Sequence, residues 1–177
     1  LISVFISILG VFIDSGMGSA LVQKKDADDL DFSTVFYFNM FMCTMLYIIM
    51  FFCSPLIAKF YNKPELMTMT RVLSLTFLIS GVKGIQCSFV SKNMLFKRFF
   101  FSTLGGTIFS AFIGVVFAYK GYGAWAIVAQ SLSNNLIDTL ILWFTVKWRP
   151  KLMFSIKRLG GLFSYGWKLL CSALLDT

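Results

Sequence analysis

The chain has 177 residues, of which 58% are hydrophobic and 14% are charged, and its formal net charge is +8. A typical soluble domain is about half apolar and about one quarter charged, so this apolar excess is larger than one globular core can use. The chain contains no histidine, which excludes His-based acid–base catalysis and nearly all catalytic zinc sites. None of the four cysteines has the spacing of a metal or redox motif. The composition therefore predicts a membrane protein and argues against a hydrolase. We expect a protein without enzymatic activity, cofactor or metal.

Long apolar runs follow one another along the chain. They cover residues 1–22, 32–58, 66–91, 99–119 and 125–146, and a further run begins near Trp167. Each of the five is long enough to cross a bilayer as a helix, and none shows the alternating ten-residue pattern of a barrel strand. The pattern predicts an all-α, polytopic transmembrane helix bundle. Because the connectors are short, consecutive helices should be antiparallel neighbours.

Both ends of the chain lie within apolar runs. We therefore expect an internal fragment of a longer protein, in which residues 1–150 form a partial transmembrane lobe. Residues 151–177 are expected to form a cytoplasmic amphipathic linker and the start of the next transmembrane helix. The linker carries four cations and a glycine pair between Lys151 and Lys168. It is predicted either to contact lipid headgroups or to be a solvated connection between two bundles.

Basic residues are distributed unequally between alternate connectors. The connectors near residues 24–31, 92–98 and 147–166 hold ten Lys and Arg residues, whereas the connectors on the other side hold three. Positive charge collects on the cytoplasmic side of membrane proteins, so we expect the first three connectors to be cytoplasmic. This topology also explains the net charge without a nucleic-acid partner. The three basic residues on the opposite side are Lys59, Lys63 and Lys120.

Four ionisable residues lie inside the apolar runs: Asp14, Arg71, Lys83 and Asp138. A charge near the bilayer centre costs about 3 kcal/mol even on a lenient scale, so each is a functional hypothesis. Asp14, Lys83 and Asp138 each precede the cytoplasmic lysine that ends their run by nine or ten residues, which places all three about 14 Å from that lysine. We expect Lys83 to contact Asp138 or Asp14. Arg71 lies nearer the outer surface, where it either snorkels or faces a cavity.

Uncharged polar residues form patterns beside these charges. Gln130, Asn134 and Asp138 recur every four residues and form one stripe, which cannot face lipid. The stripe either hydrogen-bonds to neighbouring helices or lines a water-filled cavity. In the third run Lys83 and Gln86 share a helix face at i, i+3. These residues are predicted to belong to a substrate cavity or to the packing around it.

Several stretches of the chain form a distinctive set, although each alone is a weak signal. They are DSGMGSALVQ at 14–23, DFSTVF at 31–36, PLIAKFY at 55–61 with PEL at 64–66, GYGAWAIVAQ at 121–130, and WRPKL at 148–152 followed by Phe154 and Ser155. On these stretches the chain resembles, over its whole length, the polysaccharide transporter branch of the multidrug/oligosaccharidyl-lipid/polysaccharide flippase superfamily.

The resemblance implies a fold of 12 or more helices in two six-helix lobes around a central cavity. On that plan the chain holds helices two to six of the N-terminal lobe and the start of helix seven. The implied activity is export of an oligosaccharide carried on polyprenyl pyrophosphate across the bacterial cytoplasmic membrane by alternating access, for lipopolysaccharide, capsule or exopolysaccharide biosynthesis. Membrane lipids are implied partners, and a polysaccharide polymerase and assembly proteins are further partners to be considered. Lys83 and Arg71 are the cations that we expect to attract the pyrophosphate.

Three alternatives remain open at the level of sequence. A cation-coupled multidrug antiporter of the same superfamily would use Asp14 or Asp138 to bind its coupling ion. A membrane polymerase or acyltransferase would need a long extramembrane loop with catalytic groups, and the connectors here are short. A structural membrane scaffold would tolerate neutralisation of Lys83.

Overall fold

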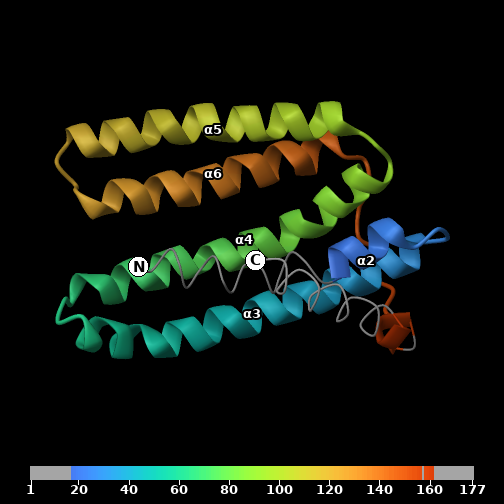
Figure 1. Ribbon diagram of the computed structural model, residues 1–177, viewed down its shortest axis with the longest axis horizontal. Helices are drawn as coiled ribbons and strands as arrows, with labels where there is room; N and C mark the ends of the chain where they lie inside the picture. Colours follow the sequence, from blue (N-terminus) through green and yellow to red (C-terminus); the bar gives the residue numbers. More distant parts are fainter. Residues whose placement is uncertain (1–16, 157, 162–177) are drawn as a thin grey trace.

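The computed structural model describes residues 17–156 and 158–161, and all regular structure among them is helical. The helices are α2 (Met17–Gln23), α3 (Asp29–Phe60), α4 (Glu65–Lys92), α5 (Phe96–Tyr119) and α6 (Ala124–Thr145). Short turns join the four long helices, as Figure 1 shows. The all-α fold class predicted from the apolar runs is confirmed. Most of the first predicted run and the whole of the sixth lie outside the described residues.

Helix α3 begins three residues before the apolar run that predicts it. Asp28 is the N-cap, and the backbone N–H of Asp28 donates to Oδ2 of Asp31 at 3.2 Å. Acidic residues in a first turn also interact favourably with the helix dipole, and Asp29 and Asp31 occupy that turn. The acidic stretch 26–31 therefore includes the N-cap and the first turn of α3.

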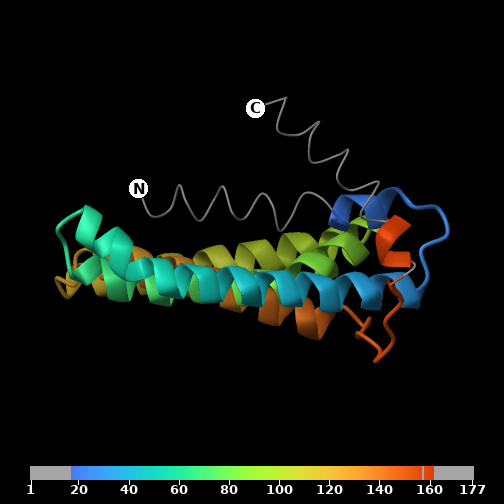
Figure 2. The ribbon, with the colours of Figure 1, turned by 90° about the horizontal axis from the view of Figure 1, so that it is seen from below.

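The long helices form two antiparallel pairs. α3 packs along α4, and α5 packs along α6; the two pairs meet mainly where α4 contacts α6. Seen edge on in Figure 2, the long helices form one layer, and α2 lies on one face of it, near the end where α3 begins. α2 contacts chiefly α4.

An apolar core lies at the end of the layer beneath α2. Leu21 of α2, Ile85 of α4 and Leu142 of α6 are at most 2% exposed and belong to one cluster. The Trp148 ring, which follows α6, stacks on Phe89 with centroids 5.9 Å apart. This core fixes α2, α4 and α6 relative to one another at the end that carries the pocket described below.

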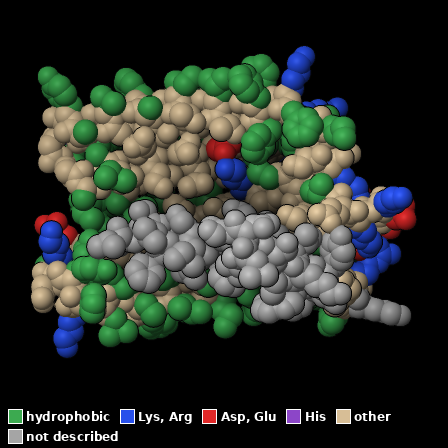
Figure 3. All heavy atoms as spheres, in the orientation of Figure 1, with side chains coloured by type: hydrophobic (Ala, Val, Ile, Leu, Met, Phe, Trp, Pro, Cys, Tyr) green, Lys and Arg blue, Asp and Glu red, His purple; other side chains and the backbone are tan. Residues whose placement is uncertain are grey.

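The outer surfaces of the long helices are strongly apolar. Large hydrophobic side chains such as Phe41, Phe52, Phe109 and Phe112 are more than 55% exposed, and Figure 3 shows hydrophobic groups along the edges of the layer. Among the described residues, α3, α4 and α5 are long and apolar enough to cross a membrane. The 22-residue α6 is also long enough to cross, but it carries several polar residues and is not one of these three helices. Its membrane crossing therefore stays a prediction.

Three connectors meet at one end of the molecule. The Lys92 ammonium donates to the carbonyl of Lys24 at 2.7 Å, and the Arg98 guanidinium donates to the carbonyl of Thr145 at 2.7 Å. Figure 3 shows Lys and Arg side chains gathered at this end. The structure thus brings the connectors that are rich in basic residues to a common side.

Candidate functional site

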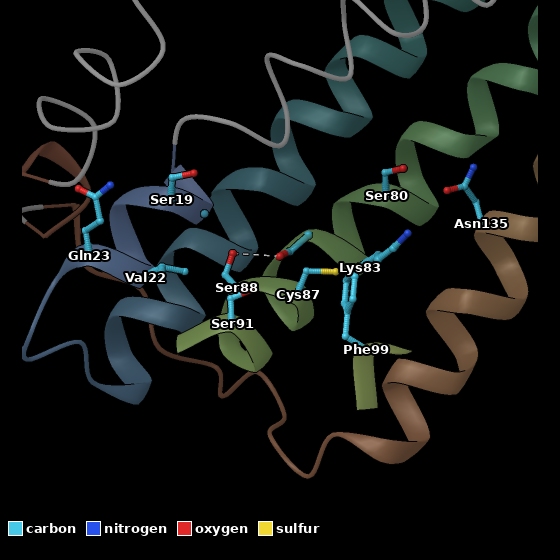
Figure 4. A pocket seen from close by; sticks show the side chains of 12 residues that line it. Ser19, Val22, Gln23, Ser80, Lys83, Cys87, Ser88, Ser91, Phe99 and Asn135 are labelled. Carbon is cyan, nitrogen blue, oxygen red and sulfur yellow. Dashed lines mark hydrogen bonds between the residues drawn. The ribbon is translucent and has the colours of Figure 1, made fainter. Parts of the chain in front are cut away.

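A pocket of about 600 Å³, lined by both polar and apolar groups, opens between α2, α4 and α6, beside the start of α5. It lies between helices whose outward faces are apolar, and Figure 4 shows the side chains that surround it. Gly18 allows α2 to approach α4 closely here, because a Cβ at that position would lie 2.6 Å from the Ser88 hydroxyl oxygen. The residues that line the pocket are Gly18, Ser19, Val22, Gln23, Ser80, Lys83, Gly84, Cys87, Ser88, Ser91, Phe99 and Asn135.

Lys83, which lines the pocket, forms an ion pair with Asp138 behind it. The Lys83 ammonium lies 2.5 Å from Oδ2 of Asp138, with the Lys83 side chain 25% exposed and the Asp138 side chain 6% exposed. The Ser102 hydroxyl of α5 donates to the Asp138 carboxylate. Of the two contacts expected for Lys83, the one with Asp138 is present, whereas Asp14 lies outside the described residues. The pair ties α4 to α6 beside the pocket.

The charge of Lys83 is therefore not a free positive charge. Lys83 is the one charged side chain among the described residues that line the pocket, and Asp138 opposes its charge at contact distance. An ammonium group has three N–H donors, so donors beyond the one used by Asp138 are available to a ligand. Lys83 can therefore donate hydrogen bonds to a ligand, although the Lys83–Asp138 pair has no net charge.

Hydroxyl and amide groups supply the rest of the polar lining. Within the described part of the chain, no hydrogen bond engages the hydroxyls of Ser19, Ser80 and Ser91, whereas Ser88 donates to the Gly84 carbonyl at 3.1 Å. Figure 4 shows Ser80 and Asn135 on the same side of the pocket as Lys83. This side presents several donors and acceptors within a small space.

Two residues of the predicted stripe on α6 face α5 instead of the pocket. A Cβ at Gly106 would lie 3.0 Å from Oδ1 of Asn134, and a Cβ at Gly114 would lie 3.1 Å from the Gln130 amide oxygen. The facing residues of α5 are small and recur every four positions: Ser102, Gly106, Ser110 and Gly114. Small residues let polar side chains and backbones of membrane helices approach closely. For Gln130 and Asn134 the structure therefore favours helix packing over a cavity lining.

Gln86 and Arg71 also lie away from the pocket lining. Gln86 is fully buried, and its amide nitrogen donates to the Trp148 carbonyl at 3.5 Å. Arg71 donates from Nε to the Ser54 hydroxyl at 3.0 Å, and its guanidinium lies 4.2 Å from the centre of the Phe51 ring. Arg71 thus bridges α3 and α4, and it does not share a site with Lys83.

Sequence reasoning missed most of the pocket-lining serines and Asn135. Six lining residues on α4 recur at steps of one, three or four positions: Ser80, Lys83, Gly84, Cys87, Ser88 and Ser91. That spacing places small and polar groups on one helix face, so the pattern was visible in the sequence. Asn135 gave a weaker signal, because it stands beside the more regular stripe of Gln130, Asn134 and Asp138.

A second group of ion pairs lies at the start of α3. Asp31 is fully buried and pairs with Lys24 at 2.6 Å and with Arg158 at 3.3 Å, while Asp29 pairs with Lys151 at 2.7 Å. The carboxylates of Asp28 and Asp31 raise the pKa of the Arg158 guanidinium. We call these residues, Asp28, Asp29 and Asp31 with Lys24, Lys151 and Arg158, the α3 charge cluster.

Backbone contacts add to the α3 charge cluster. The N–H of Lys151 donates to the Ser33 hydroxyl at 3.1 Å, and the N–H of Ser155 donates to the Thr34 hydroxyl at 3.2 Å. The described part of the linker is thus attached to α3, rather than being a fully solvated connection. No lipid is needed to account for the contacts of Lys151 and Arg158.

The chain is similar to three curated bacterial proteins. It is 31% identical over 94% of its length to the teichuronic acid biosynthesis protein TuaB of Bacillus subtilis strain 168, covering 35% of that protein. It is 24% identical over 92% of its length to the succinoglycan biosynthesis transport protein ExoT of Rhizobium meliloti strain 1021, covering 33%. It is 21% identical over 98% of its length to the lipopolysaccharide biosynthesis protein WzxC of Escherichia coli strain K12, covering 36%.

The chain therefore spans about one third of the length of these relatives. No solved structure matches it. Helices able to span a membrane and a relative named as a transport protein agree in making this chain part of a multi-pass membrane protein. The family model described as "Polysaccharide biosynthesis protein" matches residues 1–177, and the chain belongs to that family.

Proposed function

We propose that this chain is part of an exporter that moves a polyprenyl-pyrophosphate-linked oligosaccharide across the bacterial cytoplasmic membrane by alternating access. The observation that carries the proposal is the hydroxyl-lined pocket beside the Lys83–Asp138 pair, set among helices with apolar outer faces. A saccharide that crosses a bilayer must exchange its hydrogen bonds with water for hydrogen bonds with protein, because an unpaired polar group in an apolar medium costs several kcal/mol, roughly 2–7. The pocket offers such partners. The role proposed for the chain is transport rather than catalysis.

The same geometry gives less support to a cation-coupled drug antiporter. A coupling site needs a carboxylate that is open to the ion, whereas Asp138 is occupied by Lys83 and Ser102. The other carboxylate considered for that role, Asp14, lies outside the described residues. The pocket itself presents hydroxyl and amide groups, which suit a saccharide better than a hydrophobic cation.

Deletion of the gene for the full-length protein tests this function. We expect cells without the protein to make the lipid-linked oligosaccharide but to hold it in the inner leaflet, with loss of surface polysaccharide. Analysis of extracted lipid-linked saccharides, combined with surface staining, measures both. Normal surface polysaccharide in the deletion strain contradicts the proposal, and so does failure to assemble the lipid-linked oligosaccharide, which would indicate an enzyme.

Substitutions at Lys83 connect the function to the pocket. In the full-length protein we expect Lys83→Arg to retain export, because a cation still faces Asp138, and Lys83→Gln to lose it at equal membrane abundance. Export that is unchanged in Lys83→Gln would make Lys83 a structural polar residue and would leave Arg71 as the next cation to test.

We further propose that the end of the molecule carrying the α3 charge cluster is cytoplasmic, on the basis of its excess of basic residues. In a full-length protein without its native cysteines, single cysteines at Asn62 and Tyr122 should react with an impermeant thiol reagent from outside. Cysteines at Asp28, Asn93 and Ser155 should not react. Labelling of the Asn93 position in intact cells would reverse the orientation.

A further inference from the structure

We propose that the pocket between α2, α4 and α6 binds sugar residues of the lipid-linked substrate, and that the pyrophosphate is held elsewhere. This inference rests on the proposed function, and it names the part of the substrate that this pocket receives. It also revises the expectation from sequence that Lys83 attracts the pyrophosphate.

The charge balance of the pocket weakens its attraction for pyrophosphate. The cation of the lining, Lys83, lies 2.5 Å from the carboxylate of Asp138. A pyrophosphate diester in the pocket would be attracted by Lys83 and repelled by Asp138, which lies directly behind Lys83. The repulsion offsets part of the attraction, since both are Coulomb energies at short range. A neutral hydroxyl group meets no such opposition.

Asp138 is held in its place by contacts on α5. Ser102 donates to its carboxylate, and Asp138 is 4% exposed in a helix that packs closely on α5 around Gly106. An anion cannot simply displace Asp138 from Lys83, because the carboxylate would then be buried without a cation, which is strongly unfavourable. The pair therefore persists when a ligand enters.

The remaining lining of the pocket carries groups that suit a saccharide. Sugar hydroxyls both donate and accept hydrogen bonds, and so do the hydroxyls of Ser19, Ser80 and Ser91 and the amide of Asn135. The Phe99 ring, 41% exposed, offers an apolar surface to the C–H groups of a sugar ring. The cavity volume of about 600 Å³ falls within the range of about 300–1,000 Å³ that is usual for small-molecule sites.

The direct test compares two probes on purified full-length protein in lipid nanodiscs. One probe is the oligosaccharide released by mild acid from the lipid-linked precursor of the same cells. The other is inorganic pyrophosphate. We expect the saccharide to bind saturably, and pyrophosphate to bind at least about tenfold more weakly, the ratio that corresponds to about 1.4 kcal/mol.

Three variants assign the binding to this pocket. Asn135→Leu and Ser80→Ala should each weaken saccharide binding by roughly fivefold, since each removes about one hydrogen bond. Asp138→Asn should strengthen pyrophosphate binding by tenfold or more, because it frees the charge of Lys83. Thr107→Leu, on the exposed face of α5, is the matched control and should leave both affinities unchanged.

Two outcomes overturn the inference. One is tight pyrophosphate binding to the unaltered protein that Lys83→Gln abolishes. The other is saccharide binding that is absent or insensitive to both Asn135→Leu and Ser80→Ala. In either case the proposed export function survives if the deletion strain still retains its lipid-linked oligosaccharide in the inner leaflet, so the two failures are distinguishable.

Discussion

The molecule contains two kinds of ion pair, and they differ in how much stability the protein loses when one partner is removed. At the start of α3, three aspartates share Lys24, Lys151 and Arg158, and most of these side chains are more than one third exposed. Beside the pocket, one lysine and one aspartate face each other between helices. Exposed pairs contribute about 0–1 kcal/mol each, whereas loss of one partner of a buried pair costs about 3–5 kcal/mol. The cluster therefore tolerates single changes, and the Lys83–Asp138 pair should not.

The largest expected effect comes from breaking the Lys83–Asp138 pair on one side. Lys83→Met should lower the stability of the full-length protein by about 3 kcal/mol or more, because it leaves the buried Asp138 carboxylate without a cation. Asp138→Leu should also lower it, but by less, because the Lys83 ammonium that loses its partner is 25% exposed. The double variant should be less harmful than either single one, since it leaves no charge. Membrane abundance and the midpoint of thermal unfolding in detergent measure all three. Additive losses in this double-mutant cycle would argue against a contact between the two residues.

An intermediate effect is expected where α5 supports Asp138. A side chain at Gly106 would meet Asn134 at 3.0 Å and the Cβ of Asp138 at 3.1 Å. Gly106→Leu should therefore force α5 and α6 apart and cost about 1–3 kcal/mol, the usual range for overpacking. Its unfolding midpoint should fall, and its export activity should fall with it. The adjacent Thr107→Leu introduces the same side chain on the exposed face of α5 without the clash, and an equal loss there would remove this explanation.

The smallest effects are expected in the α3 charge cluster. Asp31→Asn removes the negative charge that pairs with both Lys24 and Arg158 and should cost about 1–2 kcal/mol, because Asp31 is buried but its cations reach solvent. Lys151→Gln breaks an exposed pair and should cost less than about 1 kcal/mol. Unfolding midpoints at low and high salt measure both, and the Lys151 effect should disappear in salt. If Lys151→Gln lowered the stability as much as Lys83→Met does, the proposed difference between the two groups of ion pairs would be wrong.

The sequence predicted the helical bundle, and it offered Asp138 as one of two partners for Lys83, for physical reasons. Apolar runs longer than 20 residues leave few alternatives to helices, since the backbone must satisfy its own hydrogen bonds in lipid. Lys83 and Asp138 each precede the lysine that ends their apolar run by nine residues, so a contact needed only that α4 and α6 be neighbours. That condition holds.

The lining of the pocket was less predictable. The regular spacing of Gln130 and Asn134 identified a polar face but not the partner of that face, and the small residues of α5 occupy it. Which side of a helix faces a cavity depends on how α2, α4 and α6 pack together. The sequence of one helix does not predict that packing. Arg71 illustrates the same limit: its partner Ser54 lies on another helix, 17 positions away.

The central claim is that the pocket between α2, α4 and α6 receives the saccharide of a lipid-linked substrate. The most direct measurement is photo-crosslinking in cells fed a radiolabelled sugar, with p-benzoylphenylalanine placed at Ser80 of the full-length protein and, as a control, at Ile108. Ser80 lines the pocket, whereas Ile108 is 59% exposed on α5 and faces lipid in this account. We expect labelled saccharide to become attached at Ser80 and not at Ile108. No labelling at Ser80, or equal labelling at both positions, would contradict the claim.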